Sequence, residues 1–439
     1  MLESMLNAFR APDIRKRLLF VMAILVIYRA LSHVLIPGIN PKVLTTTGPD
    51  NSFFSLLSLF SGGDIRRMSI VGLGLNPYIN ATIIMQILQS TIPSLQALSR
   101  EGEYGRNKIT SYSRWLSVPL AALQAYGILA YVQADTQTNL GIAAYTVPFS
   151  FEKYESLSMI LALTVGSVLL MWLGELITEK GIGNGISFII FAGIVSRVPA
   201  TVGSFFNSPD WLELFLFGIV GLIIIFVIIF VQEGQRRIPI QYANRVRGHR
   251  IYQGGSTFLP LRVNMAGVIP IIFAISILLF PLQIAQYFKS STVTWVADVS
   301  TGIVSWLDTR GPLYLSLYFL LTFAFAFFYT FIVFKPDETA NNLRKSGGFI
   351  PGIRPGAPTE EYLRRVALRI TVAGAIFVAS VAVLPMVIAA LPMFKNLSNA
   401  GIGVGLGGTS VLIVVSVVVE TMKQLEAQLM MRSYEGFIR

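Results

Sequence analysis

The sequence contains no cysteine, so disulfide bonds, thiol nucleophiles and cysteine-ligated metals are excluded. Histidine is nearly as scarce, because His33 and His249 are the only two in the chain. The motifs His-Glu-x-x-His, Gly-x-Ser-x-Gly and the phosphate-binding Gly-x-x-x-x-Gly-Lys-Ser/Thr are also absent. The sequence therefore predicts no catalytic residue, no metal site and no cofactor, and we do not expect the protein to be an enzyme.

Charged residues are scarce as well. They make up 13% of the chain, against roughly 25% in soluble domains, while hydrophobic residues make up 54%. About ten hydrophobic runs are long enough to cross the hydrocarbon core of a bilayer as helices. These runs begin near residues 18, 72, 116, 156, 185, 212, 265, 313, 370 and 402. The predicted fold class is an all-α polytopic membrane protein with ten transmembrane helices.

Carboxylates are missing from the interiors of these runs, because Glu175, Glu179, Glu213 and Glu420 all lie near run ends. Transporters that couple to ions or protons usually place an acidic residue or a histidine near the bilayer midplane. The distribution therefore counts against a coupled transporter and leaves an uncoupled one open.

Lysine and arginine are concentrated in alternate loops. Most of the 34 basic residues lie at the N-terminus, in every second loop and in the C-terminal tail. By the positive-inside rule both termini are cytoplasmic, which requires an even number of spans. Two of the basic loops, about residues 232–264 and 335–369, are longer than topology needs. We interpret them as a docking surface for an acidic protein or an RNA backbone, with attraction to anionic lipid as the alternative.

The second and seventh runs carry the same interruption, Gly-x-x-Pro-x-Ile. It falls at Gly74 and Pro77 in one half of the chain and at Gly267 and Pro270 in the other. A glycine and a proline three apart loosen the helical hydrogen-bond ladder, which a membrane tolerates where protein or a water-filled cavity covers the backbone. A break repeated in two halves predicts a central pathway between them.

Residues 52–71 do not fit a spanning helix. A run of about eight apolar residues is too short to cross the bilayer. Asp64, Arg66 and Arg67 would also be costly in lipid. The segment is predicted either as a loop helix at the outer interface or as a short re-entrant helix that stops a pore.

A series of ordered motifs extends over nearly the whole chain. They are Phe60-Ser61-Gly62-Gly63, Gly74-x-x-Pro77-Tyr78-Ile79, Glu101-Gly102-Glu103-x-Gly105-Arg106, Thr178-Glu179-x-Gly181-Ile182-Gly183-Asn184-Gly185-Ile186-Ser187, Asn264-Met265-Ala266-Gly267-Val268-Ile269-Pro270, Pro351-Gly352-Ile353-Arg354-Pro355-Gly356 and Arg432-Ser433-Tyr434-Glu435-Gly436-Phe437. Together these motifs resemble the SecY family, the pore-forming subunit of the bacterial protein-conducting channel of the cytoplasmic (inner) membrane.

The resemblance implies two inverted five-helix halves around an hourglass pore. Residues 1–206 would hold the first five spans and the plug (about 52–71), and residues 207–439 the last five spans, both cytoplasmic loops and the tail. Before the first span, Leu2, Met5, Leu6 and Phe9 recur at helical spacing, consistent with a surface helix, with a disordered tail as the alternative. A lateral gate would lie between the second and third helices and the seventh and eighth.

The resemblance also implies roles for particular residues. The plug would contain Phe60, Ser61, Gly62, Gly63, Asp64, Arg66 and Arg67. The apolar pore ring would consist of Leu75, Ile79, Ile186, Ile190, Ile272 and Ile413. Such a ring excludes ions by dewetting, yet flexible aliphatic side chains can part around an extended polypeptide. Gln86 and Asn264 match polar positions at the lateral gate. Asn76 stands where an apolar residue is usual.

The implied function is translocation of unfolded preproteins and lateral release of transmembrane segments into the membrane lipid. The implied partners are the SecE and SecG subunits, the motor ATPase SecA, the ribosome through its RNA and proteins, and the signal sequences of substrates. Arg250 and Arg354 match positions that engage SecA and the ribosome, with His249 in place of the first arginine of the usual pair. The alternatives are an uncoupled inverted-repeat solute transporter and a membrane insertase.

Overall fold

The computed structural model describes residues 11–37, 68–140, 154–196, 198–199, 203, 211–242, 245–247, 250–252, 256–288, 293–307, 311–390 and 408–438. Most of this part of the chain is helical. The helices are α2 (Pro12–Leu31), α6 (Asn76–Thr91), α7 (Pro93–Arg100), α8 (Glu103–Leu140), α9 (Tyr154–Lys180), α10 (Gly185–Val195), α12 (Trp211–Glu233), α13 (Ile269–Phe288), α14 (Thr294–Trp306), α15 (Pro312–Val333), α16 (Pro336–Lys345), α17 (Ala357–Ala390) and α20 (Gly408–Ile438).

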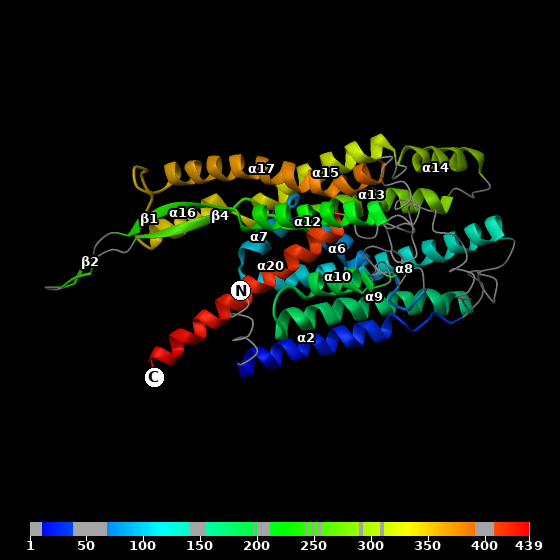
Figure 1. Cartoon of the computed structure of the whole chain (residues 1–439), viewed down its shortest axis with the longest axis horizontal. Coiled ribbons are helices and arrows are strands. Elements are labelled where there is room, and N and C mark those ends of the chain that lie inside the picture. Colours follow the sequence, from blue (N-terminus) through cyan, green and yellow to red (C-terminus); the bar gives the residue numbers. More distant parts are fainter. Residues whose placement is uncertain are drawn as a thin grey trace.

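The long helices run roughly along one axis and form an elongated bundle (Figure 1). Each predicted hydrophobic run coincides with one of them, which confirms the predicted helical membrane fold. Within the described residues, three helices meet the length and apolarity of a membrane span: Ser156–Lys180, Pro312–Lys345 and Ala357–Leu384. Others fall short, as α10 does with 11 residues. The number of ten spans therefore stays a prediction.

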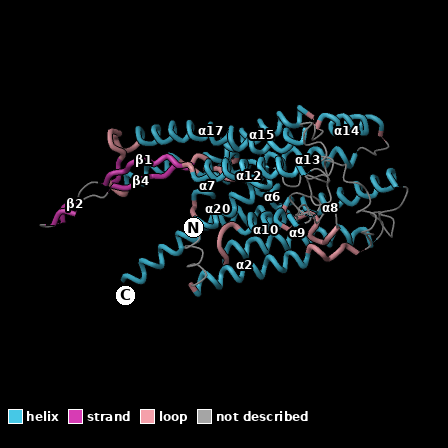
Figure 2. The backbone as a smooth tube through the Cα atoms, in the orientation of Figure 1, coloured by secondary structure: helices cyan, strands magenta, loops and turns pink. Residues whose placement is uncertain are grey.

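The two predicted cytoplasmic loops contain strands that the all-helical prediction missed. β1 (Gln235–Tyr242) pairs antiparallel with both β4 (Ser256–Arg262) and β5 (Gly348–Phe349). β2 (Arg245–Arg247) and β3 (Arg250–Tyr252) form a second, two-stranded sheet. All the labelled strands project from one end of the bundle (Figure 2).

A small hydrophobic cluster joins the two loops into one unit. Ile238 of β1 and Leu261 of β4 are buried together with Ile350, Leu363 and Val366 from the second loop and the start of α17. Because β1 also pairs with β5, the loops that the sequence presents separately share one sheet and one core. The arginines of β1 and β4 and the loop that holds Arg354 thus belong to a single folded protrusion.

Both Gly-x-x-Pro interruptions mark the start of a helix. Gly74 and Gly267 have φ angles of 61° and 65°, a left-handed conformation that favours glycine. Helix α6 begins two residues after Gly74 and helix α13 two residues after Gly267. Pro77 and Pro270 are then the second residues of their helices, where a missing backbone N–H costs nothing. The predicted breaks are therefore sharp turns followed by new helices, rather than loosened segments within continuous ones.

Candidate functional site

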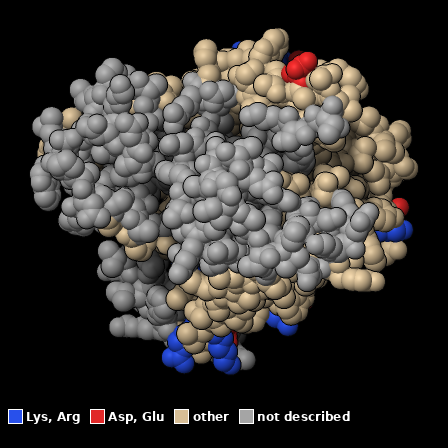
Figure 3. Space-filling view, turned by 90° about the vertical axis from the view of Figure 1, so that its right-hand side faces the viewer, with Lys and Arg blue, Asp and Glu red and all other residues tan. Residues whose placement is uncertain are grey.

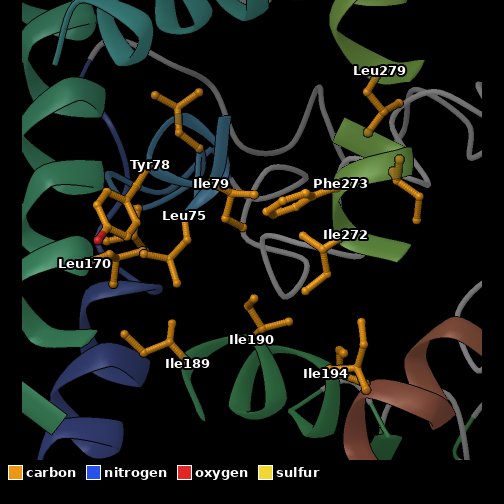
Figure 4. Close-up of a cluster of buried hydrophobic side chains, with 14 of the residues drawn as sticks. Leu75, Tyr78, Ile79, Leu170, Ile189, Ile190, Ile194, Ile272, Phe273 and Leu279 are labelled. Atoms are coloured by element: carbon orange, nitrogen blue, oxygen red, sulfur yellow. The ribbon is translucent and has the colours of Figure 1, made fainter. Parts of the chain in front are cut away.

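The six predicted ring residues all belong to one central hydrophobic cluster. Leu75, Ile79, Ile190, Ile272 and Ile413 are buried, and Ile186 is half-buried and packs against the cluster. Figure 4 shows Leu75 and Ile79 on one side of this cluster, Ile272 opposite them and Ile190 below. The structure thus brings together side chains from both halves of the chain, and every one of them is aliphatic.

The ring residues lie at or near the starts of their helices. Ile79 and Ile272 lie in the first turns of α6 and α13, and Ile190 and Ile413 lie at the sixth residues of α10 and α20. Four helices therefore begin near the centre of the bundle and present aliphatic side chains from their first two turns. The described turns before α6, α10 and α13 therefore help to decide where the ring lies.

The start of α10 is held by a side-chain cap and a close helix contact. The Asn184 side-chain oxygen accepts hydrogen bonds from the N–H groups of Ile186, at 3.1 Å, and Ser187, at 3.3 Å. A Cβ atom on Gly185 would lie 1.8 Å from the carbonyl oxygen of Gly174 in α9. Only glycine permits this approach, so α9 and the cap together position α10.

Asn264 performs a similar task before α13. Its side-chain oxygen accepts the N–H of Gly267 at 3.0 Å, and its side-chain amide donates to the carbonyl oxygen of Gly267 at 3.1 Å. Asn264 is buried, and both of these bonds stay within its own turn. The side-chain oxygen of Gln86, in contrast, is buried with no hydrogen-bond partner in the described part of the chain. The structure packs α6 against α13 but joins Gln86 and Asn264 by no hydrogen bond that it describes.

The two predicted docking arginines belong to the region of the strands, which project from one end of the molecule (Figure 1). Arg354 is exposed on a loop between β5 and α17, where Gly352 and Gly356 have φ angles of 82° and 109°. The Thr359 hydroxyl donates to the carbonyl oxygen of Arg354 at 2.8 Å and stabilises this loop. Arg250 begins β3 and pairs with Arg247 across the second sheet.

A comparison with protein families decides the identity. The family model described as SecY matches residues 69–422. The chain belongs to the SecY family. It is 42% identical over 448 residues to the protein translocase subunit SecY of Streptomyces scabiei, with 100% of both chains covered. It is 40% identical over 461 residues to the protein translocase subunit SecY of Mycobacterium leprae, again with 100% of both chains covered.

Solved structures share the fold of this SecY-family chain. A protein-conducting channel matches with a TM-score of 0.62 and 18% identity, covering 93% of this chain and 91% of that chain. Sec61 in a canine ribosome–channel complex from the endoplasmic reticulum matches with a TM-score of 0.60 and 18% identity, at the same coverage. These matches confirm the predicted SecY-type helical architecture.

Of the predicted SecY-type plug, about residues 52–71, residues 52–67 lie outside the described residues, as does His249, while Met68 and Val71 are buried in the central hydrophobic cluster. The structure adds a positioning contact that the sequence reasoning missed. The Ser167 hydroxyl of α9 donates to the carbonyl oxygen of Gly74 at 3.0 Å, and a Cβ on Gly166 would lie 1.9 Å from the Ile70 carbonyl oxygen. Small residues within an apolar run mark close contacts in membranes, so this pair was a readable signal.

Proposed function

We propose that this SecY-family protein is a protein-conducting channel that translocates unfolded preproteins across the cytoplasmic membrane and releases transmembrane segments sideways into the bilayer. The central observation is the buried aliphatic cluster where α6, α10, α13 and α20 begin. An aliphatic constriction repels water and ions, whereas its side chains can move apart around a polypeptide of almost any sequence. A site for a solute would instead need polar groups that fix its orientation.

The proposed route runs between two halves of the chain, which we place on either side of about residue 206. The ring residues come from both halves, and the repeated Gly-x-x-Pro turns precede α6 and α13 in corresponding ways. The seam between these two helices is the proposed lateral gate, with Gln86 and Asn264 as its polar residues. A polar seam would weaken helix packing and so allow an apolar signal segment to open it. Residues 52–71 would form the plug that stops the pore.

We further propose that a partner supplies the driving force, since the protein itself is proposed to have no enzymatic activity. With both termini cytoplasmic, the strand-bearing protrusion would also face the cytoplasm. Its exposed Arg354 and the arginine-rich β1–β4 region would then bind the motor ATPase SecA or the RNA and proteins of the ribosome. One solved neighbour of the same fold is described as part of a ribosome–channel complex. SecE and SecG would complete the channel.

Site-specific photocrosslinking tests the pathway directly. Probes at Ile79, Ile190 and Ile272 are introduced into the complete channel complex in membrane vesicles, and a secretory precursor is arrested during transport. Ile223 and Ile376 are matched controls, because these isoleucines are exposed on the outside of α12 and α17. We expect crosslinks at the three ring positions that require SecA and ATP, and none at the controls.

Two other outcomes would contradict the proposal. If the precursor is bound and arrested but no ring position crosslinks, the pathway does not pass through the aliphatic cluster. If membrane segments insert while secreted precursors never cross, the protein acts as an insertase. Saturable transport of a small solute without any partner would instead support an uncoupled transporter.

A further inference from the structure

Helix α13 is enclosed by protein around the ring residue Ile272. Residues 271–276 are all buried, and all of them except Ser276 are apolar. Six successive residues cover more than one full turn, so every face of the helix is covered there. Hydrophobic burial has no preferred direction, so it does not decide which of these side chains points into the ring. Apart from the turn at Gly267, the rotation of α13 about its own axis must therefore depend on contacts that have a preferred direction.

Phe273 makes two contacts of this kind with helix α15. The centroid of its ring is 5.9 Å from that of Phe325 and 6.0 Å from that of Tyr329, and the interplanar angles are 85° and 83°. Both pairs have the edge-to-face geometry that the charge distribution of aromatic rings favours. Phe325 and Tyr329 are four residues apart, so they lie on one face of α15. We call Phe273, Phe325 and Tyr329 the aromatic clamp.

The clamp is directly linked to the ring through the backbone of α13. Phe273 follows Ile272, so the two side chains leave the helix about 100° apart. Figure 4 shows Phe273 above Ile272, both on the side of α13 that faces Ile79. Because both side chains are fixed to one rigid turn, a rotation that moved Ile272 out of the ring would also separate Phe273 from the two rings of α15.

A second aromatic pair on α15 provides a comparison. Phe323 and Phe327 have ring centroids 5.0 Å apart and an interplanar angle of 54°. Both residues are half-buried, as are Phe325 and Tyr329. This pair lies within one helix, so its ring contact cannot hold one helix against another. The pair therefore separates the general effect of an aromatic contact from the effect of a contact between helices.

We infer that Phe273 is a positioning residue, which acts through Phe325 and Tyr329 to set the rotation of α13 and so holds Ile272 in the aliphatic ring. The same contacts join α13 to α15, so the two helices on one side of the proposed lateral gate would move as one unit. As an account of how the channel closes, this inference rests on the proposed function. The positioning of Ile272 itself can be tested without it.

The clamp also lies near the strand-bearing protrusion. Tyr329 is four residues before the end of α15, and the chain then continues through α16 into β5. A partner that binds the protrusion would therefore act on α15 close to the clamp. At the opposite end of the molecule, few of the described side chains that Figure 3 shows are charged. That end offers fewer charges to which such a partner could bind.

The cysteine-free sequence makes a direct test of the ring geometry feasible. The double variant Ile79→Cys, Ile272→Cys places the only two thiols of the chain at facing ring positions, and cysteine is itself small and apolar. Into this background we introduce Phe273→Leu, Tyr329→Leu, Tyr329→Phe or Phe323→Leu. The full chain with its partner subunits is reconstituted in phosphatidylethanolamine–phosphatidylglycerol vesicles without substrate.

The measurement is the rate at which dibromobimane, a small reagent that becomes fluorescent when it bridges two thiols, links the two ring positions. Labelling of Ile272→Cys alone by monobromobimane, in the same four variants, corrects for access of the reagent. We expect Phe273→Leu and Tyr329→Leu to lower the ratio of bridging to labelling about threefold, because each loses directional ring contacts. Tyr329→Phe keeps the ring and should leave the ratio unchanged, and so should Phe323→Leu.

Three outcomes would overturn the inference. An unchanged ratio in both Phe273→Leu and Tyr329→Leu would show that the clamp does not position Ile272. An equal fall in Phe323→Leu would show that any lost aromatic contact disturbs the ring. A fall in Tyr329→Phe as large as that in Tyr329→Leu would assign the effect to the hydroxyl group. If the Phe273→Leu complex does not assemble, the two variants of the half-buried Tyr329 still decide between these outcomes.

Ion conductance of the Phe273→Leu complex, with both ring isoleucines intact, separates this inference from the proposed function. We expect the resting conductance in a planar bilayer to rise, because a displaced Ile272 would leave the constriction open to water. A lower bridging ratio without any conductance would still support the positioning role of Phe273. It would instead contradict the proposal that the aliphatic ring seals a channel.

Discussion

The backbone N–H groups of Ile79 and Ile272 close the first turns of their helices in the same way. Ile79 donates to the carbonyl oxygen of Leu75 at 2.9 Å, and Ile272 donates to that of Val268 at 3.4 Å. Each isoleucine comes five residues after a glycine with positive φ, and each is buried. One local arrangement, used once in each half of the chain, thus supplies two facing members of the aliphatic cluster.

If this cluster seals the channel, Ile272→Asn should make the resting channel leak ions. The amide replaces an apolar side chain by a smaller, polar one that binds water, so it would hydrate the constriction. Ion conductance of the purified channel complex in a planar bilayer measures the effect directly. Export of precursors with defective signal sequences should rise in parallel, since a wetted constriction opens more readily.

Ile177→Asn is the control for that prediction. Ile177 is fully buried in α9 and belongs to the same hydrophobic cluster, but it is outside the ring. Its replacement should lower stability without producing conductance. Equal leakage in the two variants would show that any polar group in the core causes leakage, and the ring assignment would fail.

Asn264→Ala should destabilise the protein by about 1–3 kcal/mol, because both peptide groups of Gly267 lose a partner in a buried turn. Thermal unfolding of the detergent-solubilised complex measures the change. Asn341→Ala is the matched control, because Asn341 is exposed on α16. Unchanged stability in Asn264→Ala would contradict a stabilising role for these two hydrogen bonds. The proposed role of Asn264 at the gate seam would then be the one that remains.

Arg354→Glu should abolish SecA-driven export while the level of the protein in the membrane stays normal. Charge reversal at the tip of an exposed loop removes an attraction and adds a repulsion, yet it disturbs no packed side chain. Export of a labelled precursor into inverted vesicles provides the measurement.

The comparison variant for Arg354 is Arg365→Glu. Arg365 is 65% exposed and forms an ion pair with Glu361 on α17, so its loss costs little stability. We expect export to continue in this variant. Normal export in Arg354→Glu would place the docking surface elsewhere. Equal loss of export in both variants would show that docking depends only on general positive charge.

Tyr318→Phe should raise stability by about 1 kcal/mol. The hydroxyl groups of Tyr314 and Tyr318 are buried on one face of α15 and have no hydrogen-bond partner among the described residues. Removal of a buried, unsatisfied polar group removes its desolvation cost. Thermal unfolding is again the measurement, with Tyr112→Phe as the control because Tyr112 is 41% exposed. A loss of stability would show that a bound water or partner subunit satisfies the hydroxyl.

Local features of the fold were readable from the sequence because they depend on neighbours along the chain. The Gly74–Pro77 and Gly267–Pro270 pairs mark turns wherever they occur, since glycine tolerates positive φ and proline suits the first turn of a helix. The hydrophobic runs likewise predicted helices that the structure contains. Asn264, which the resemblance assigns to the gate, also has the spacing of a side-chain cap before Gly267.

Non-local pairing could not be predicted in the same way. Strand β1 alternates buried Ile238 and Ile240 with exposed residues, but Pro239 between them argues against a strand. Its partners are β4 and the distant β5, so the sheet exists only once the two loops meet. The capping contact from Ser167 to Gly74 also joins segments far apart in the sequence.

The sequence alone therefore determined that the protein is a helical membrane protein, where two of its hydrophobic runs are interrupted and, by resemblance, which family it joins. Hydropathy and turn chemistry act over a few residues, so a sequence displays them directly. Only the tertiary structure decided that four helix starts converge on one aliphatic cluster and that two loops share one sheet. These features depend on which surfaces are left to pack together after the whole chain has folded, and no short stretch of sequence carries that information.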